Sequence, residues 1–214
     1  KSKPLPVFYV YDSYHIAPRD WKKLLQPPDQ GGDKTLSIRS TASDAFVLFL
    51  MVEANHADYA KVGGFDGFYT YFAADGFTYG STLRSWSKLQ ALASSTNTVF
   101  VPSVGPGYID VSVRPWNAAT TRDRKNGKYY EKSWQSALKS APHNREHVVS
   151  ITSFNEWHEG TQIEPAIPAI RGKPVNMRGS AKKYVDYGSL GPNGYLELTK
   201  KFSDQLTEMN KKFH

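Results

Sequence analysis

The alternation of short apolar runs with helical patterns is the feature that most limits how this chain can fold. Five runs rich in β-branched and aromatic residues predict strands, at residues 7–12, 46–52, 65–71, 98–104 and 147–153. Several of these runs are almost continuously apolar, which is typical of parallel strands buried on both faces beneath helices. We therefore expect a parallel sheet.

Helical patterns occupy the segments between the predicted strands. Residues 18–25 begin with a proline, which suits a first helical turn, and residues 55–62 predict a short second helix. In the last helix, Glu197 and Lys201 are expected to form an i,i+4 ion pair. Three further helices are predicted by apolar residues that share one face: Leu83, Trp86, Leu89 and Ala93; Tyr130, Trp134, Ala137 and Leu138; Tyr195, Leu198, Phe202, Leu206 and Met209.

Five βα units in a row predict an α/β fold, either an open doubly wound sheet or a (β/α)8 barrel. A barrel needs eight strands and typically about 250 residues. The chain has 214 residues, and three strands of a barrel are missing from the count. Residues 26–34 predict a polar Pro/Gly loop, and no repeat or domain boundary is visible.

Composition excludes several classes of protein. With no cysteine, the chain has no disulfide scaffold, thiolate nucleophile or Cys-ligated metal. The longest apolar run, residues 45–52, is far too short to cross a bilayer, so we expect no membrane contact. The formal net charge is +7, but the Lys and Arg residues are dispersed, so we expect no nucleic-acid partner. The first residues of the chain contain no initiator Met and no apolar leader, as expected of a fragment.

Residues 151–165 carry the densest group of reactive side chains. An apolar run ends at Ser153, and Asn155, Glu156, Trp157 and Glu159 follow it. In α/β folds, ligands bind at the carboxyl ends of strands. Paired carboxylates are what glycoside hydrolysis requires, one as the acid and one as the base or nucleophile, and an indole can stack on a sugar. The alternative is that both glutamates are ordinary exposed loop acids.

Two other strand ends offer polar and aromatic groups. Arg114, Trp116 and Asn117 supply donors and a stacking face for a hydroxyl-rich ligand; alternatively, Trp116 is a packing residue and Arg114 a surface cation. Tyr69 and Tyr71 share a face of their strand, and Tyr71, nearer its end, is either a site hydroxyl or a core tyrosine.

Histidines give a weaker signal. The chain has no HExxH motif and no paired metal-ligand spacing. His15 follows a strand end and could contact a substrate, and His158 lies between the two glutamates, but a structural role is the more common one for either. The sequence also contains no GxSxG, P-loop or GxGxxG motif.

Together these segments resemble the C-terminal portion of the animal endo-α-1,2-mannosidases, glycoside hydrolase family 99. The resemblance runs nearly from end to end, and residues 26–43 and 166–183 follow it less closely. The motifs that carry it are FYVYDSY (8–14), GFDG (64–67), YTYFA (69–73), GFTYGS (76–81), PSVGPGYID (102–110), RPWN (114–117) and SITSFNEWHEGTQIE (150–164).

The resemblance implies a (β/α)8 barrel, of which residues 1–214 would form the C-terminal part, about the last five βα units of a single domain. It implies a retaining endo-α-1,2-mannosidase that acts on glucosylated high-mannose N-glycans through a 1,2-anhydro sugar, in the Golgi lumen. The N-terminal part of the barrel would then be a possible partner. An open barrel would leave strand edges and inner apolar faces exposed.

Matched position by position, the resemblance makes Glu156 the base and Glu159 the general acid/base, which must hold a proton at neutral pH. It places substrate contacts at Tyr71, Arg114, Trp116, Asn155, Trp157 and, less strongly, His15. It implies no metal and no cofactor. The alternative is a non-catalytic fragment that binds glycans or acts as a structural partner in an assembly.

Overall fold

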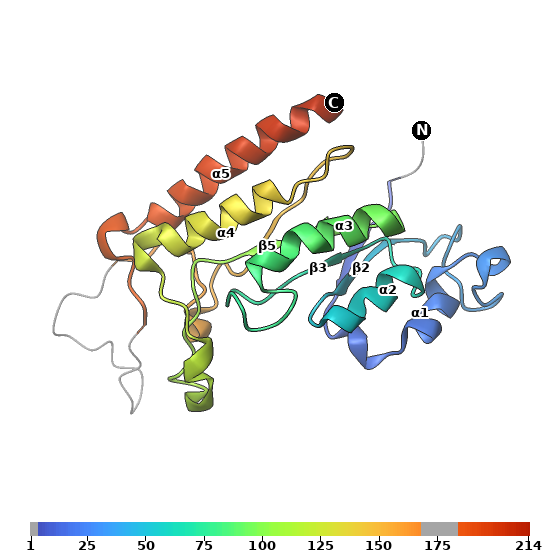
Figure 1. Cartoon of the computed structure of the whole chain (residues 1–214), viewed down its shortest axis with the longest axis horizontal. Coiled ribbons are helices and arrows are strands. Elements are labelled where there is room, and N and C mark those ends of the chain that lie inside the picture. The colour runs from blue at the N-terminus through green and yellow to red at the C-terminus, as the bar shows by residue number, and fades with distance from the viewer. Residues whose placement is uncertain (1–3, 168–183) are drawn as a thin grey trace.

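The computed structural model describes residues 4–167 and 184–214, and its centre is a set of parallel strands with helices packed on one side (Figure 1). Four strands pair in parallel in the order of the sequence, and two more form a second parallel pair. The first four are β1 (Val7–Val10), β2 (Phe46–Leu50), β3 (Gly67–Tyr69) and β4 (Val99–Val101), and the pair is β5 (Ser103–Val104) and β6 (Ser150–Ile151).

The run predicted as one strand at 98–104 is two strands separated by Pro102. Proline has no N–H to donate, so it interrupts the ladder between β4 and β5. The hydrogen bonding nevertheless continues to β6, because Ser150 N donates to the Pro102 carbonyl at 3.0 Å. On the other side, Ser103 N donates to Thr70 Oγ1 at 2.9 Å. These hydrogen bonds connect the two sheets, so the strands follow one another along one curved wall. The architecture is a partial α/β barrel.

The two faces of the sheet bury different side chains. Leu48, Leu50, Tyr69 and Val101 form an inner cluster against which Tyr71 packs, so Tyr69 and Tyr71 share a face as predicted. Residues of the opposite parity, among them Phe49, Phe68 and Phe100, point into the larger core beneath the helices. This division matches the inner and outer layers of a barrel wall.

All five predicted helices are present, with small differences at their ends. The second begins as a 3-10 turn, Ala54–His56, and the third is likewise preceded by Leu83–Ser85. No described helix is long and apolar enough to cross a membrane. The helices are α1 (Pro18–Leu25), α2 (Ala57–Lys61), α3 (Trp86–Thr96), α4 (Lys128–Lys139) and α5 (Gly194–Asn210).

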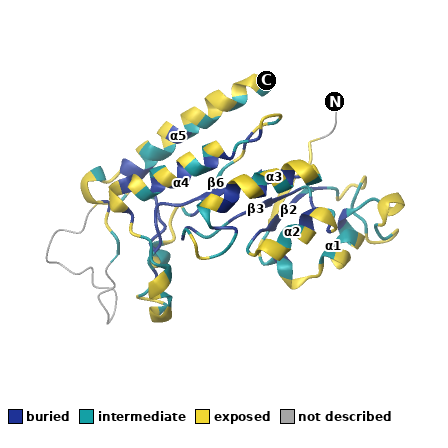
Figure 2. Ribbon diagram, in the orientation of Figure 1, coloured by how far each residue is buried: buried dark blue, intermediate teal, exposed yellow. Residues whose placement is uncertain are grey.

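Helices α4 and α5 lie side by side and pack through aromatic rings (Figure 1). Trp134 and Phe202 stack with their centroids 5.6 Å apart, and Tyr130 meets Tyr195 at 5.8 Å. The expected Glu197–Lys201 pair is wrong: Lys201 bonds to Glu131 of α4 at 3.3 Å. Because the two helices pack closely, a carboxylate on the neighbouring helix replaces the one on the same helix. The outward side of α5 is exposed (Figure 2).

Strand β1 departs from the expectation that the strands are buried on both faces. Val7, Phe8 and Tyr9 are 54%, 55% and 47% exposed. Within the described residues, β1 pairs only with β2, so its other edge has no neighbour. This exposed apolar edge is the one that an open barrel is expected to have.

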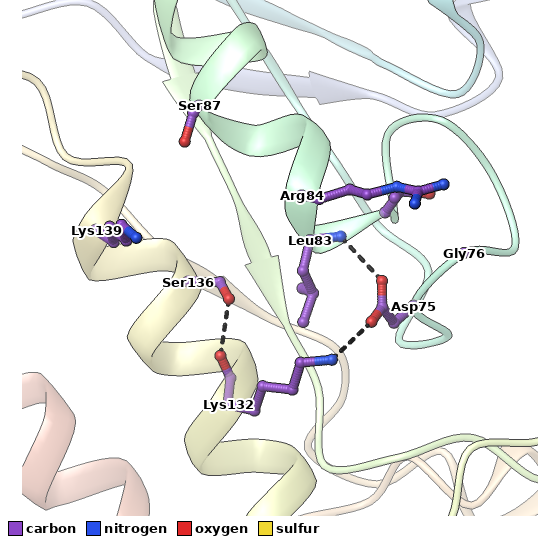
Figure 3. Close-up of a pocket in the computed structure, with 9 residues that line it drawn as sticks. Asp75, Gly76, Leu83, Arg84, Ser87, Lys132, Ser136 and Lys139 are labelled. Atoms are coloured by element: carbon purple, nitrogen blue, oxygen red, sulfur yellow. Dashed lines mark hydrogen bonds and ion pairs between the residues drawn. The ribbon is translucent and has the colours of Figure 1, made fainter.

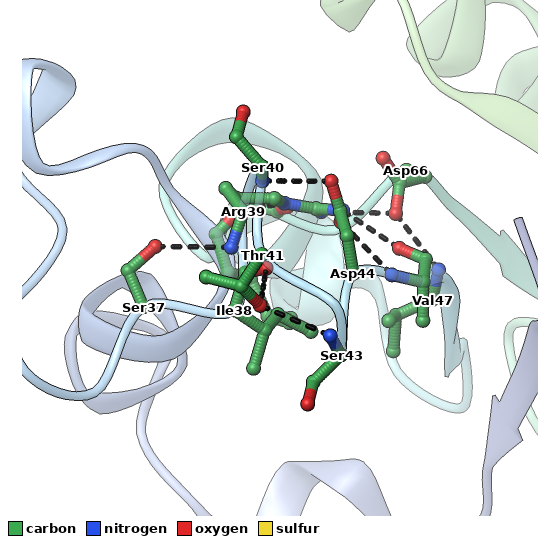
Figure 4. Close-up of polar contacts among 12 residues, drawn as sticks. Ser37, Ile38, Arg39, Ser40, Thr41, Ser43, Asp44, Val47 and Asp66 are labelled. Carbon is green, nitrogen blue, oxygen red and sulfur yellow. Dashed lines mark hydrogen bonds and ion pairs between the residues drawn. The ribbon is translucent and has the colours of Figure 1, made fainter. Parts of the chain in front are cut away.

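Arg39 links the loop between α1 and β2 to residues at the start of β2 and β3 (Figure 4). Its side chain is 11% exposed and pairs with Asp44 at 3.2 Å and Asp66 at 2.9 Å. It also donates to three carbonyls, those of Leu25, Ala45 and Gly64. Every donor group of the guanidinium has a partner, so one side chain orders a loop that is rich in polar residues.

Candidate active site

Segments that follow β5 and β6 come together at the carboxyl ends of the strands. The loop between β5 and α4, residues 105–127, extends from the body of the molecule, and the turn after β6 lies beside it (Figure 1). Ile109 N donates to the Glu159 carbonyl at 2.8 Å, which joins the two segments directly. The predicted groups after β5 and β6 therefore occupy one site.

Local hydrogen bonds shape the turn that carries the two glutamates. Ser153 Oγ accepts the Glu156 N–H at 2.9 Å, and Glu156 Oε1 accepts the His158 N–H at 3.2 Å, as the cap of the 3-10 turn Trp157–Glu159. Gly160 then takes a left-handed φ of 63°. A Cβ there would lie 2.5 Å from the Ile109 side chain, so both the backbone angle and the space require glycine.

Both carboxylates lie near enough to the phenol of Tyr71 to affect its pKa. Burial raises the pKa of Tyr71, and the negative charges of Glu159 and Glu156 raise it further. Glu156 is exposed, and the Glu159 side chain is 22% exposed. The acids thus lie at a surface that water or a sugar can reach, beside a phenol that keeps its proton at neutral pH.

Arg114 links Glu159 to a buried acid. One guanidinium nitrogen, Nη1, donates to Glu159 Oε1 at 2.9 Å and to Asp110 Oδ2 at 3.1 Å. These hydrogen bonds, to Asp110 first and Glu159 second, raise the pKa of Arg114. Asp110 Oδ2 also accepts Tyr108 Oη at 2.9 Å and Asn117 Nδ2 at 2.8 Å. Arg114 is therefore bound on both sides rather than a free surface cation.

The remaining predicted residues differ in their exposure and in their contacts with the two glutamates. Trp116 is 78% exposed on the 3-10 turn Pro115–Thr120, so it does not pack in the core. Asn155 is exposed at the start of the glutamate turn. Trp157 donates its indole N–H to Glu164 at 2.9 Å, which fixes the ring toward that side. His15 Nε2 lies 3.8 Å from Asp12, and no bond joins it to either glutamate.

Three residues of the site were not predicted. Tyr11, the residue after β1, meets the Tyr71 ring edge-on at 5.3 Å, and burial first, then the negative charges of Asp12 and Glu159, raise its pKa. Asp110 could have been noticed, because it stands four residues before Arg114. Arg124 carried no signal, since it appeared only within a mixed run of charges.

Arg124 is buried and supports the glutamate turn from behind. Its guanidinium donates to the Gly160 carbonyl through Nε at 3.2 Å and Nη2 at 2.8 Å, and to the Gln162 carbonyl at 2.6 Å. Its Cζ lies 4.7 Å and 5.1 Å from the ring centroids of Tyr195 and Tyr187. Burial lowers the pKa of Arg124. Carbonyl dipoles and ring faces thus compensate a cation that has no carboxylate partner in the described part of the chain.

A separate groove of about 610 Å³ lies between α3 and α4 (Figure 3). Arg84, Lys132 and Lys139 line it, and Lys132 pairs with Asp75 at 3.1 Å. The groove contains neither glutamate, so it is not part of the site. Within residues 4–167 and 184–214, no three His, Asp or Glu side chains are grouped so as to hold a metal ion.

Comparisons with known proteins show which sequences and structures this chain is similar to. Residues 1–208 match the sequence model of glycosyl hydrolase family 99. The chain is 49% identical over 212 residues to a glycoprotein endo-alpha-1,2-mannosidase of Xenopus laevis, covering 99% of this chain and 43% of that protein. It is 47% identical over 204 residues to a human glycoprotein endo-alpha-1,2-mannosidase-like protein, covering 95% of this chain and 41% of that one.

A solved structure is similar as well. It is the GH99 endo-alpha-mannosidase of Bacteroides thetaiotaomicron in complex with bis-tris-propane, which superposes with a TM-score of 0.82 at 43% identity. The match covers 97% of this chain and 60% of that one. The chain thus spans less than half the length of the two animal relatives and three fifths of the bacterial structure.

Proposed function

The chain belongs to glycosyl hydrolase family 99, and from that membership we propose that it carries the acid pair of an endo-α-1,2-mannosidase. The proposed substrate is a glucosylated high-mannose N-glycan, cleaved with retention at an α-1,2-mannosidic bond. Residues 1–214 would supply the C-terminal part of one barrel domain, in a protein that acts in the Golgi lumen. The observation that carries the proposal is that Glu156 and Glu159 lie on one short turn after β6, where Arg114 of the loop after β5 contacts Glu159 at 2.9 Å.

The environments of the two glutamates suit different roles. Glu156 is exposed, makes no ion pair within the described residues, and accepts one backbone N–H. Its carboxylate therefore keeps acceptor capacity for a sugar hydroxyl. Glu159 is less exposed and is oriented by Arg114. A fixed side chain suits a general acid, which must be held within hydrogen-bond distance of the leaving oxygen.

In the proposed reaction, Glu156 takes the proton of the substrate 2-hydroxyl, and that oxygen attacks C1. The glycosidic C1–O bond breaks as Glu159 gives its proton to the leaving oxygen. Water then attacks C1 of the 1,2-anhydro sugar and opens the three-membered ring. Glu159 takes a proton from the water, and Glu156 returns its proton to O2, so both acids regain their starting state.

The remaining predicted residues would hold the glycan. Tyr71 offers a phenol beside both acids, Asn155 an exposed amide, and Trp116 an open face on which a sugar ring can stack. Arg114 and Trp157 would act mainly by fixing Glu159 and the turn. His15 would contact other sugars of the glycan, because no hydrogen bond or ion pair joins it to either acid. No metal or cofactor enters this scheme.

The exposed edge of β1 favours a second candidate function. Because Val7 and Phe8 are exposed, the chain offers a surface to a structural partner, such as the N-terminal part of the barrel. In that reading the chain binds a glycan or completes an assembly without catalysing hydrolysis itself.

The test is release of a glucosylated mannose saccharide from a glucosylated high-mannose glycan, followed by mass spectrometry. We expect the product from the wild-type chain, and none from Glu156→Gln or Glu159→Gln. Glycan binding that survives in Glu159→Gln, together with no hydrolysis by the wild type, would support the second candidate and reject the first.

A further inference from the structure

The contact between Arg114 and Glu159 sets a problem for the proposed function, on which this inference rests. A general acid must hold a proton when the substrate binds. A guanidinium in contact with a carboxylate favours the ionised form, which has no proton to give. Arg114 Nη1 lies 2.9 Å from Glu159 Oε1, so an uncompensated Arg114 would oppose the role assigned to Glu159.

Asp110 supplies the missing compensation. Its side chain is fully buried, and its Oδ2 lies 3.1 Å from the same Arg114 nitrogen that contacts Glu159. Two other donors, from Tyr108 and Asn117, converge on that oxygen and hold it in place. The two carboxylates therefore share one Arg114 nitrogen, and they lie no more than about 6 Å apart.

We propose that Asp110 is a positioning residue: the buried counter-charge that fixes Arg114 while offsetting part of its positive charge at Glu159. The negative charge of Asp110 acts on Glu159 across no more than about 6 Å, and like charges at short range disfavour ionisation. The guanidinium therefore orients the Glu159 carboxyl by a hydrogen bond, but holds it ionised less strongly than an arginine without Asp110 would.

Among the residues that the structure describes, no other group around Glu159 balances the charge of Arg114 in this way. Tyr11, Tyr71 and Tyr108 face it from the ends of β1 and β3 and from the loop after β5, and burial raises the pKa of each phenol. These three groups are therefore neutral at pH 7. Glu156 adds a negative charge on the same turn, but it does not contact Arg114. Asp110 is the acid that pairs with Arg114 on its buried side.

Asp110→Asn is the sharpest perturbation. An amide oxygen can replace Oδ2 and still accept its three donors, while the amide nitrogen takes the place of Oδ1, which has no partner among the described residues. The change thus removes a charge and keeps the shape. The measurement is a carboxyl carbon-13 NMR titration of protein labelled at glutamate, with the Glu159 signal identified by its loss in Glu159→Gln.

We expect Asp110→Asn to lower the proton affinity of the Glu159 carboxyl between about tenfold and a hundredfold, the size of a charge interaction across about 6 Å near a protein surface. Arg114→Met should raise that affinity, because it leaves Glu159 beside Asp110 with no cation between them. A purely structural role for Asp110 would not make the two variants move in opposite directions.

Asp204→Asn is the matched control, since it removes the same charge from an exposed Asp on α5 that pairs with Lys200. It should leave the Glu159 titration unchanged. An unchanged titration in a folded Asp110→Asn protein would overturn the proposal, as would a fall in proton affinity in Arg114→Met. Because the readout is proton binding rather than hydrolysis, failure of the mannosidase proposal would be seen separately, as absence of released saccharide.

Discussion

Replacing Arg124 by methionine should loosen the turn that carries both glutamates. The guanidinium makes three hydrogen bonds to the carbonyls of Gly160 and Gln162, and it lies against the rings of Tyr187 and Tyr195. Methionine keeps the apolar volume but leaves the two carbonyls without these donors. The variant therefore separates the hydrogen bonds of Arg124 from its packing.

The size of the effect follows from two opposing contributions. Hydrogen bonds from a charged donor contribute about 1.5–3 kcal/mol each, and a carbonyl left unpaired in the interior costs about 1–3 kcal/mol. Against this, the variant no longer buries a cation whose pKa is lowered by burial, which returns several kcal/mol. We expect a net loss of about 2–4 kcal/mol in the free energy of unfolding. At a slope of about 2–3 kcal/mol per molar urea, the midpoint should fall by about 1 M.

Urea unfolding followed by circular dichroism measures this shift, and saccharide release measures kcat. A displacement of about 1 Å in the glutamate turn should lower kcat about a hundredfold. Arg124→Lys should lose most of the same stability, because a point charge cannot reach both carbonyls as the planar fork does. Exposed Arg19 is the matched control, and Arg19→Met should change stability by less than about 0.5 kcal/mol. Wild-type stability and kcat in Arg124→Met would refute the reasoning.

Three further perturbations test other parts of the fold. Gly160→Ala should lower the free energy of unfolding by about 1–3 kcal/mol in urea titrations, because of its φ of 63° and the crowding by Ile109; an unchanged midpoint would contradict this. Arg39→Ala should cost about 3 kcal/mol in the same assay, since it leaves Asp44 and Asp66 unpaired, whereas a loss below about 0.5 kcal/mol would mean that the loop is held by other contacts. Burial lowers the pKa of His147 in the folded state, so the unfolded chain binds the proton more readily, and stability should fall as the pH drops below about 6.5. His147→Gln should flatten that pH dependence, and an unchanged slope would exclude His147 as its source.

Apolar runs in the sequence predict the fold well because strands and helices here bury continuous stretches. The helix at 18–25 has the predicted ends, and the five strand runs all contain strands. The break at Pro102 was missed, although proline in a central strand is a known warning, because the flanking apolar residues continue the pattern on both sides. The exposure of β1 depends on which neighbour a strand has, which the composition of the strand cannot reveal.

The site is predicted in part for the same physical reason. Glu156, Glu159 and Tyr71 follow strand ends, and the rule that such ends converge is enough to bring them together. The Asp110–Arg114 contact has a local spacing, but the bond from Arg114 to Glu159 joins residues 45 positions apart. Contacts between residues far apart in the sequence also explain why the predicted Glu197–Lys201 pair was wrong: Lys201 pairs with Glu131 of another helix.

Two arginines of one loop, residues 105–127, bind adjacent points of the glutamate turn. Arg114 binds the side chain of Glu159, and Arg124 binds the carbonyl of Gly160. Because both arginines fix the same turn, weakening one attachment should change what the other contributes. A double-mutant cycle of Arg114→Met and Arg124→Met should therefore show a coupling of about 0.5–3 kcal/mol in the free energy of unfolding. Additivity within about 0.3 kcal/mol would mean that the two arginines act independently.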